Sequence, residues 1–268
     1  MKLTIIGCSD AFGSGGRYHS CYILETSRGR LMIDCGANSP LALKRAGISM
    51  ADIDAVVISH CHGDHFGGLP FLFLDKMFMG NGSKPLEILG PPGIQRRTEN
   101  LIESSYPAIQ TLPRGFEIVY KELPPGAVTG WRGLPVSAFE MDHFSGTPSL
   151  GLAFDDEGSR FSFSGDSCWC QGVIDAGRGA DLYLIECTKF SGPSPVHLDY
   201  MTISANFGTI GAKRYLLTHM SDEMLKSLNK IDRRKCVAAE DGLSLTIGSK
   251  TLFGAAKRYG SRLSGKIF

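Results

Sequence analysis

Histidine and aspartate residues are concentrated in one short run of the chain, Ser59-His60-Cys61-His62-Gly63-Asp64-His65. Imidazole nitrogens and carboxylate oxygens are the ligands that Zn²⁺, Fe and Mn ions take in proteins. Three histidines and one aspartate are more than one tetrahedral ion with an open position can use, so the run predicts a pair of ions. The alternative, a solvated polar loop with chance histidines, does not explain this density of ligand types.

A two-ion site requires further ligands elsewhere in the chain. One of them must be an anionic bridge, because two divalent cations held about 4 Å apart repel each other strongly. Three candidates each follow an apolar, strand-like segment: His143, Asp166 and His219. A residue at the tip of a buried strand has a fixed backbone, which a metal site requires. Each candidate taken alone is explained as well by a structural role, and it is their occurrence together with the first motif that favours a metal site.

Short strand-like segments alternate with helix-like ones along the chain, and this alternation predicts an α/β fold. The expected strands cover residues 3–6, 21–25, 30–33, 55–58, 86–89, 116–120, 134–141, 160–166, 181–185 and 214–219. The expected helices cover residues 40–46, 68–77, 92–104, 200–210 and 222–228. Ser39 and Ser221 are candidate N-caps of the first and last of these helices. His60 would then stand at a strand end, with the other ligands of its run on the loop that follows.

The chain resembles the metallo-β-lactamase superfamily, and within it the branch of ribonuclease Z and related phosphodiesterases. The resemblance extends from residue 3 to about residue 247, and its most specific motifs are S-H-C-H-G-D-H-F-G-G-L at 59–69, S-G-D-S at 164–167 and L-T-H-M-S at 217–221. It implies a four-layer αβ/βα sandwich of two mixed β-sheets flanked by helices. It also implies two divalent ions, one held by His60, His62 and His143 and the other by Asp64, His65 and His219, with Asp166 bridging them. Zn is the expected metal, although the same ligands accept Mn or Fe.

Two ions that share a carboxylate and keep an open face predict a hydrolase. A water shared by both ions has its pKa lowered toward neutrality, so a metal-bridging hydroxide is the expected nucleophile. The resemblance adds a leaving-group acid, because ribonuclease Z relatives carry a histidine paired with a glutamate at the places of His197 and Glu186. A carboxylate beside an imidazole raises the pKa of the imidazole and fixes its orientation. The candidate catalytic residues are therefore Asp64, His197 and Glu186, with capping or packing as the alternative role for His197.

The acid pair favours phosphodiester hydrolysis, since lactone, thioester and β-lactam hydrolysis in the superfamily do not require the same histidine. The interval between His143 and Asp166 holds only two strands and a turn at residues 155–158, which leaves no room for the tRNA-gripping arm of ribonuclease Z enzymes. The longer interval between His65 and His143 is expected to form a lid or a homodimer surface. The formal net charge of +1 gives no global field that would attract a large polyanion. We therefore expect a small-molecule or short oligonucleotide phosphodiester as substrate, such as a cyclic nucleotide.

Other functions remain open from the sequence. A lactone or ester hydrolase would act with the same ions on a carboxylic ester, and a ribonuclease Z-type tRNA 3′ endonuclease would act on a larger phosphodiester. An iron-dependent redox enzyme would use the same fold for different chemistry. A non-catalytic binding module is disfavoured, because such modules lose ligands and all the ligand positions are filled here.

Composition and cysteine spacing give the expected domain organisation and location. At 268 residues with 43% hydrophobic content, the chain is expected to form one hydrolase domain over residues 1–249. A basic C-terminal tail over residues 250–268 would pack on that domain or extend from it. The eight cysteines are irregularly spaced and no secretion signal is evident, so we expect a cytoplasmic protein with reduced thiols and no membrane contact. Cys168 and Cys170 are interpreted as ordinary thiols, because no matching C-x-x-C pair completes a sulfur site.

Overall fold

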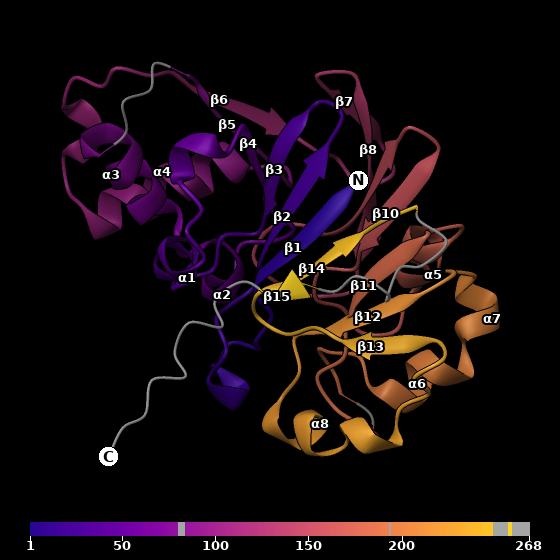
Figure 1. Cartoon of the computed structure of the whole chain (residues 1–268). Helices are drawn as coiled ribbons and strands as arrows, with labels where there is room; N and C mark the ends of the chain where they lie inside the picture. The colour runs from indigo at the N-terminus through magenta and orange to yellow at the C-terminus, as the bar shows by residue number, and fades with distance from the viewer. Residues whose placement is uncertain (80–83, 193, 249–256, 259–268) are drawn as a thin grey trace, which may run out of the picture.

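Two β-sheets stacked face to face, with helices on both outer sides, make up the fold (Figure 1). The computed structural model describes residues 1–79, 84–192, 194–248 and 257–258. One outer layer contains α1 (Ser39–Arg45), α3 (Leu69–Phe78) and α4 (Ile94–Ser105). The other contains α5 (Gln171–Gly177), α6 (Tyr200–Ala205) and α7 (Phe207–Ile210). The predicted four-layer αβ/βα sandwich is therefore confirmed.

The first sheet has the strand order β15-β14-β1-β2-β3-β4-β5-β6. Its parallel part consists of β3 (Gly29–Ile33), β4 (Ala55–Val57), β5 (Leu86–Gly90) and β6 (Ile118–Glu122). Its antiparallel part consists of β1 (Lys2–Gly7), β2 (Cys21–Thr26), β14 (Leu243–Thr246) and β15 (Lys257–Arg258), and β2 also pairs antiparallel with β3. Apart from the two residues of β15, the predicted basic tail lies outside the described residues.

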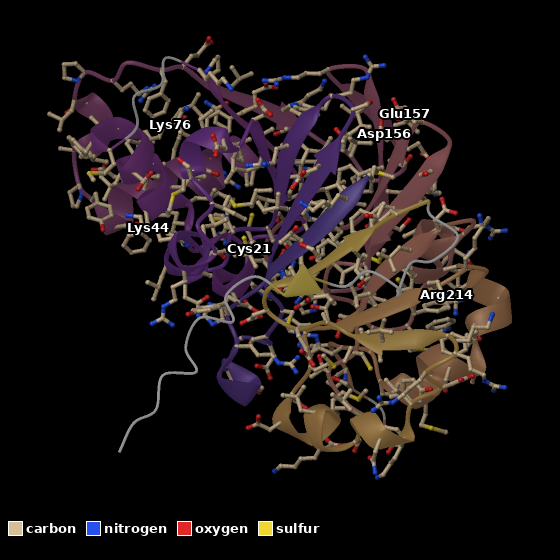
Figure 2. The ribbon with its side chains drawn as sticks, in the orientation of Figure 1. Cys21, Lys44, Lys76, Asp156, Glu157 and Arg214 are labelled. Carbon is tan, nitrogen blue, oxygen red and sulfur yellow. The ribbon has the colours of Figure 1, made fainter. Side chains whose placement is uncertain are left out.

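The second sheet has the strand order β13-β12-β11-β10-β9-β8-β7. Its parallel part consists of β10 (Ser159–Phe163), β11 (Leu182–Glu186), β12 (Tyr215–Thr218) and β13 (Cys236–Ala238). Antiparallel pairing joins β10 to β9 (Ser149–Asp156), β9 to β8 (Leu134–Met141) and β8 to β7 (Val128–Trp131). The hairpin of β9 and β10 is short, and Asp156 and Glu157 lie at its tip (Figure 2).

The strands bury side chains on both faces, because each sheet packs against the other sheet on one side and against helices on the other. In β3, Leu31 and Ile33 belong to the core between the sheets, whereas Met32 belongs to the core beneath the helices. In β12, Leu216 points into the core between the sheets and Leu217 into the core under the second helical layer. These near-continuous apolar strands hold the loops at their carboxyl ends in fixed positions.

Local hydrogen bonds account for the helix ends. Ser221 caps α8 (Asp222–Lys226) as predicted, since its hydroxyl accepts a hydrogen bond from the Met224 N–H. The prediction for Ser39 is wrong, because Ser39 is the first residue of α1 and Asn38 is the N-cap. The helix expected over residues 200–210 is interrupted at Asn206, whose side chain donates to the Thr202 carbonyl at 2.8 Å, so that α6 and α7 are separate.

Three-residue helical turns complete the first layer and the loops: η1 (Ser14–Gly16), η2 (Met50–Asp52), η3 (Ile109–Thr111) and η4 (Leu228–Lys230). The described part of the chain has no helix of the length and apolar character needed to cross a bilayer. Within the same residues all eight cysteines are free thiols.

Candidate metal centre

Loops at the carboxyl ends of strands from both sheets bring the predicted ligands together. The first sheet supplies the loop after β4 and the single turn of α2 (Gly63–Phe66). The second sheet supplies the loops after β8, β10 and β12. All seven predicted ligands lie in two groups whose ligand atoms are within 4.8 Å of one another: His60, His62 and His143 in one, and Asp64, His65, Asp166 and His219 in the other.

The first group consists of three imidazoles. The Nδ1 atom of His62 lies 3.1 Å from Nε2 of His143, and the rings of His60 and His62 are 4.9 Å apart between centroids. The Nε2 atom of His60 is buried and has no hydrogen-bond partner among the described residues. A buried ring nitrogen without a partner costs free energy unless something else occupies the space in front of it. An ion bound by three imidazoles fits this arrangement.

The second group surrounds two carboxylates. The Nε2 atom of His219 lies 3.2 Å from Oδ2 of Asp64 and 3.3 Å from Oδ2 of Asp166. The Nε2 atom of His65 lies 3.4 Å from Oδ2 of Asp64 and 3.3 Å from Oδ1 of Asp166. His65 Nε2 and Asp166 Oδ1 are buried and lack hydrogen-bond partners in the described part of the chain. Two carboxylates and two imidazoles around unpaired atoms fit a second divalent cation.

Asp166 contacts both groups. Its Oδ2 atom lies 3.9 Å from Nε2 of His60 and 3.9 Å from Nε2 of His143, while its Oδ1 atom faces His65. The side chain is 3% exposed. Burial raises the pKa of this carboxyl group, but the charges of His219 and His65 outweigh burial and hold the pKa well below its usual value. Asp166 therefore lies between the two groups as a buried, charged carboxylate.

Further contacts fix the orientation of the ligand rings through their second nitrogen. His65 Nδ1 lies 2.7 Å from Oδ2 of Asp34, and His143 Nδ1 lies 2.9 Å from the carbonyl oxygen of Val196. His60 Nδ1 lies 3.1 Å from the hydroxyl of Ser59, which in turn donates to Asp34. Partners of this kind determine which nitrogen of a metal-bound imidazole carries the proton.

The sequence analysis missed Asp34, which is fully buried directly after β3. Its place at the end of a strand is the signal it shares with the ligands, but a single aspartate at a strand end is common. Asp34 and His219 both adopt left-handed backbone conformations, with φ of 56° and 55°. L-residues rarely adopt such conformations, and they are concentrated at functional sites.

His197 and Glu186 form a hydrogen-bonded pair next to the second group. His197 Nδ1 lies 3.1 Å from Oε1 of Glu186 and 3.9 Å from Oδ2 of Asp166. The same Oε1 atom accepts the Ser167 backbone N–H at 2.6 Å, and Glu186 is fully buried at the end of β11. Burial lowers the pKa of His197, but the hydrogen bond and charge of Glu186 raise it above the ordinary histidine value. This imidazole therefore keeps its proton to a higher pH than an ordinary histidine does.

The remaining candidates lie outside the two ligand groups. Cys168 and Cys170 belong to neither group, and the Cys168 thiol donates to the carbonyl oxygen of Pro195 at 2.9 Å. His197, Glu186 and His219 also lie within ligand distance of one another. The seven predicted ligands and the pair of His197 and Glu186 thus lie in one continuous site.

Comparisons with known proteins identify a family and several relatives of this chain. A family model described as anti-Pycsar protein Apyc1 matches residues 1–241. Ribonuclease Z of Methanosarcina acetivorans is 27% identical over 92% of this chain and 98% of the relative, and anti-Pycsar protein Apyc1 of Paenibacillus sp. (strain J14) is 33% identical over 59% of this chain and 64% of the relative.

Solved structures show the same fold. The short form of human tRNase Z superposes with a TM-score of 0.75 at 24% identity, covering 92% of this chain and 99% of that structure. The metallo-β-lactamase-fold protein YhfI from Bacillus subtilis gives a TM-score of 0.74 at 21% identity, covering 91% and 97%. The resemblance to the metallo-β-lactamase superfamily and its ribonuclease Z branch is therefore confirmed. The match over residues 1–241 shows that the chain belongs to the anti-Pycsar protein Apyc1 family.

Proposed function

We propose that this protein is a metal-dependent phosphodiesterase that cleaves a small or short phosphodiester, either a cyclic nucleotide or an oligonucleotide. The observation that carries the proposal is the hydrogen-bonded pair of His197 and Glu186, located 3.9 Å from the carboxylate that joins the two ligand groups. An alkoxide is a poor leaving group, and a positioned acid lowers the barrier to its departure. Relatives named ribonuclease Z and anti-Pycsar protein Apyc1 support a phosphodiester as the substrate class.

Each residue of the site is assigned a separate role in the proposed reaction. His60, His62 and His143 are assigned to one ion, and Asp64, His65 and His219 to the other, with Asp166 shared. When bound there, two such ions, zinc in our proposal, would supply polarisation of a phosphoryl oxygen and a lowered pKa for bound water. His197 donates its proton to the departing oxygen, while Glu186 holds the ring and stabilises its charged form. Asp64 would hold the second ion together with His219, since its Oδ2 lies 3.2 Å from Nε2 of His219.

The shape of the chain near the site favours a small substrate. Strands β9 and β10 follow each other with a turn between Asp156 and Ser159, so the interval from His143 to Asp166 carries no protruding arm. With a formal net charge of +1, the surface has no general excess of positive charge to hold a precursor tRNA. A tRNA 3′ endonuclease is the second candidate, because the similarity to ribonuclease Z covers nearly the whole chain.

We also propose that the protein forms a homodimer through the first helical layer. A cavity of about 620 Å³ between α1 and α3 is lined mainly by apolar side chains, and Leu41, Phe71, Phe78 and Met79 are 45–74% exposed. Lys44, labelled in Figure 2, lines this cavity. Its Nζ pairs with Oδ1 of Asp75 at 3.3 Å. Contiguous exposed apolar groups rimmed by polar residues mark interaction surfaces. This surface belongs to the interval between His65 and His143 and to the helix α1 that packs beside it.

To test the function, we compare the hydrolysis rates of substrates with different leaving groups, using purified protein of known metal content. Wild-type protein should hydrolyse cyclic nucleotides or short oligonucleotides in preference to precursor tRNA, lactones and thioesters. His197→Ala should lower the rate on nucleotide substrates by about 10²–10⁴-fold with metal content unchanged. The same variant should retain most activity on bis-p-nitrophenyl phosphate, whose leaving group needs no proton. Equal losses on both substrate types would remove the acid role.

A further inference from the structure

The hydroxyl of Thr188 lies between a predicted metal ligand and the acid pair. Its Oγ1 atom is 3.0 Å from Oε2 of Glu186 and 3.3 Å from Nδ1 of His219. The Thr188 backbone N–H donates to the carbonyl oxygen of Leu198, the residue after His197, at 3.1 Å. The Thr188 carbonyl oxygen accepts the backbone N–H of Ser221 at 3.1 Å, two residues after His219. The residue is therefore fixed on both sides, toward the acid and toward the ligand.

The directions of the hydrogen bonds follow from the number of protons available. In the proposed site Nε2 of His219 would bind the second ion, so the single proton of the neutral ring would be carried on Nδ1 and donated to the Thr188 hydroxyl at 3.3 Å. That hydroxyl has one hydrogen and two acceptors in reach, the Glu186 carboxylate and the His219 carbonyl oxygen at 3.1 Å. The carboxylate is charged and slightly nearer, so it receives the hydrogen.

Glu186 completes the connection. Its Oε2 atom accepts from Thr188, and its Oε1 atom accepts from the Ser167 N–H and from Nδ1 of His197. An uninterrupted series of hydrogen bonds thus runs from His219 through Thr188 and Glu186 to His197.

The same arrangement occurs at the other ligand group. His60 Nδ1 contacts the Ser59 hydroxyl at 3.1 Å, and that hydroxyl donates to Oδ2 of Asp34 at 2.8 Å. In both cases a hydroxyl accepts a hydrogen bond from an imidazole of the site and donates one to a buried carboxylate. We infer that Thr188 orients His219 as Ser59 orients His60. The two cases differ because the carboxylate that Thr188 contacts, Glu186, also holds His197.

We propose that Thr188 is a positioning residue that fixes the His219 ring and the Glu186 carboxylate with one hydroxyl, and so couples metal binding to leaving-group protonation. The inference rests on the proposed phosphodiesterase function. It requires that removal of the hydroxyl weaken metal binding and acid assistance together, because both depend on the same oxygen.

The test uses Thr188→Val, which keeps the shape and removes the hydroxyl, and Thr188→Ser, which keeps the hydroxyl. Thr98→Val is the matched control, because the buried Thr98 hydroxyl in α4 has no partner among the described residues. Zinc affinity is measured by competition with a chelator. Thr188→Val should bind zinc about 10-fold more weakly than wild type, whereas Thr188→Ser and Thr98→Val should match wild type. Thermal melting verifies that each variant is folded.

Kinetics on the zinc-saturated variants test the link to the acid. Thr188→Val should lose about 10-fold more activity on nucleotide diesters than on bis-p-nitrophenyl phosphate. In a His197→Ala background this extra loss should disappear, while the weaker zinc binding should persist. Unchanged zinc affinity in Thr188→Val, equal losses on both substrates, or failure of Thr188→Ser to restore both properties would overturn the proposal. If wild-type protein cleaves no phosphodiester, the proposed function fails, and the zinc competition still decides whether Thr188 supports His219.

Discussion

His65 Nδ1 lies 2.7 Å from Oδ2 of Asp34, and this contact determines that Nε2 of the ring faces the second ligand group. Both side chains are fully buried. Burial raises the pKa of Asp34, and His65 and the Ser59 hydrogen bonds only partly offset that effect. A buried carboxylate that orients one ligand directly and a second through Ser59 controls the geometry of both groups.

Asp34→Asn should therefore reduce zinc affinity by about 10–100-fold, because the substitution removes the charge that holds the proton on Nδ1 of His65. Chelator competition followed by metal analysis measures the change. Asp156→Asn is the control, since Asp156 is also buried and accepts two hydrogen bonds from Ser27, but at the distant hairpin tip (Figure 2). The control should retain wild-type affinity, and equal affinity in Asp34→Asn would contradict the orienting role.

Asp166→Ala should deplete at least one ion per chain and remove nearly all activity, because the remaining ligands leave two like charges without a shared anion. Metal content after dialysis, determined by mass spectrometry, gives the result. Asp155→Ala serves as the control, since Asp155 is 42% exposed and pairs only with Arg160 among the contacts of the described residues. A variant at position 166 that still binds two ions would remove the bridge assignment.

The grouping of these side chains could be predicted from the sequence because histidine and aspartate are chemically distinctive and the candidate residues follow strand ends. Strand ends are readable from apolar segments, as at His60 after β4 and His219 after β12. Asp34 could not be predicted, since its function depends on reaching His65, 31 positions away, across the sheet edge. The break between α6 and α7 was also missed, because the hydrogen bond that Asn206 makes to the Thr202 carbonyl competes with helix propensity in a way that a pattern does not reveal.

Glu186→Gln should move the alkaline limb of the activity profile to lower pH. His197 must be protonated to act as an acid, so activity falls as the pH rises through its pKa. Burial lowers that pKa, and the hydrogen bond and charge of Glu186 raise it above the ordinary value. A neutral amide keeps the shape but removes the charge, so the pKa of His197 falls and the limb moves with it. The alkaline limb is measured as kcat/KM against pH on a nucleotide diester. If Glu186→Gln leaves it at the same pH, the pair of Glu186 and His197 does not determine it.

Phe78→Asp should convert the proposed homodimer into a monomer without loss of zinc. Phe78 is 61% exposed beside the apolar cavity, and a carboxylate there would have to be desolvated in an interface. Sedimentation velocity at several protein concentrations measures the state. Val128→Asp is the control, since Val128 is 70% exposed on β7, in the second sheet. A wild-type protein that is monomeric at all concentrations would refute the proposed interface.

Zinc binding to metal-free protein should release protons at pH 7, and zinc affinity should rise with pH up to about 9. Burial disfavours the charged form of His219, but Asp166 and Asp64 outweigh burial and raise its pKa to about 9. The pKa of His65 is raised well above its usual value for the same reason. Both rings are therefore protonated at pH 7 in the metal-free protein, and an ion binds only the neutral imidazole.

Because the folded-state pKa of His219 is above the unfolded value, its contribution to the stability of the metal-free protein is complete below about pH 6.5 and is lost as the pH rises through about 9. Titration calorimetry in buffers of different ionisation enthalpy counts the released protons, and melting of chelator-treated protein across this range measures the stability. Zinc binding that releases no protons at pH 7 would show that the rings of His219 and His65 are already neutral. The nearby carboxylates would then raise the pKa values of these rings less than we infer.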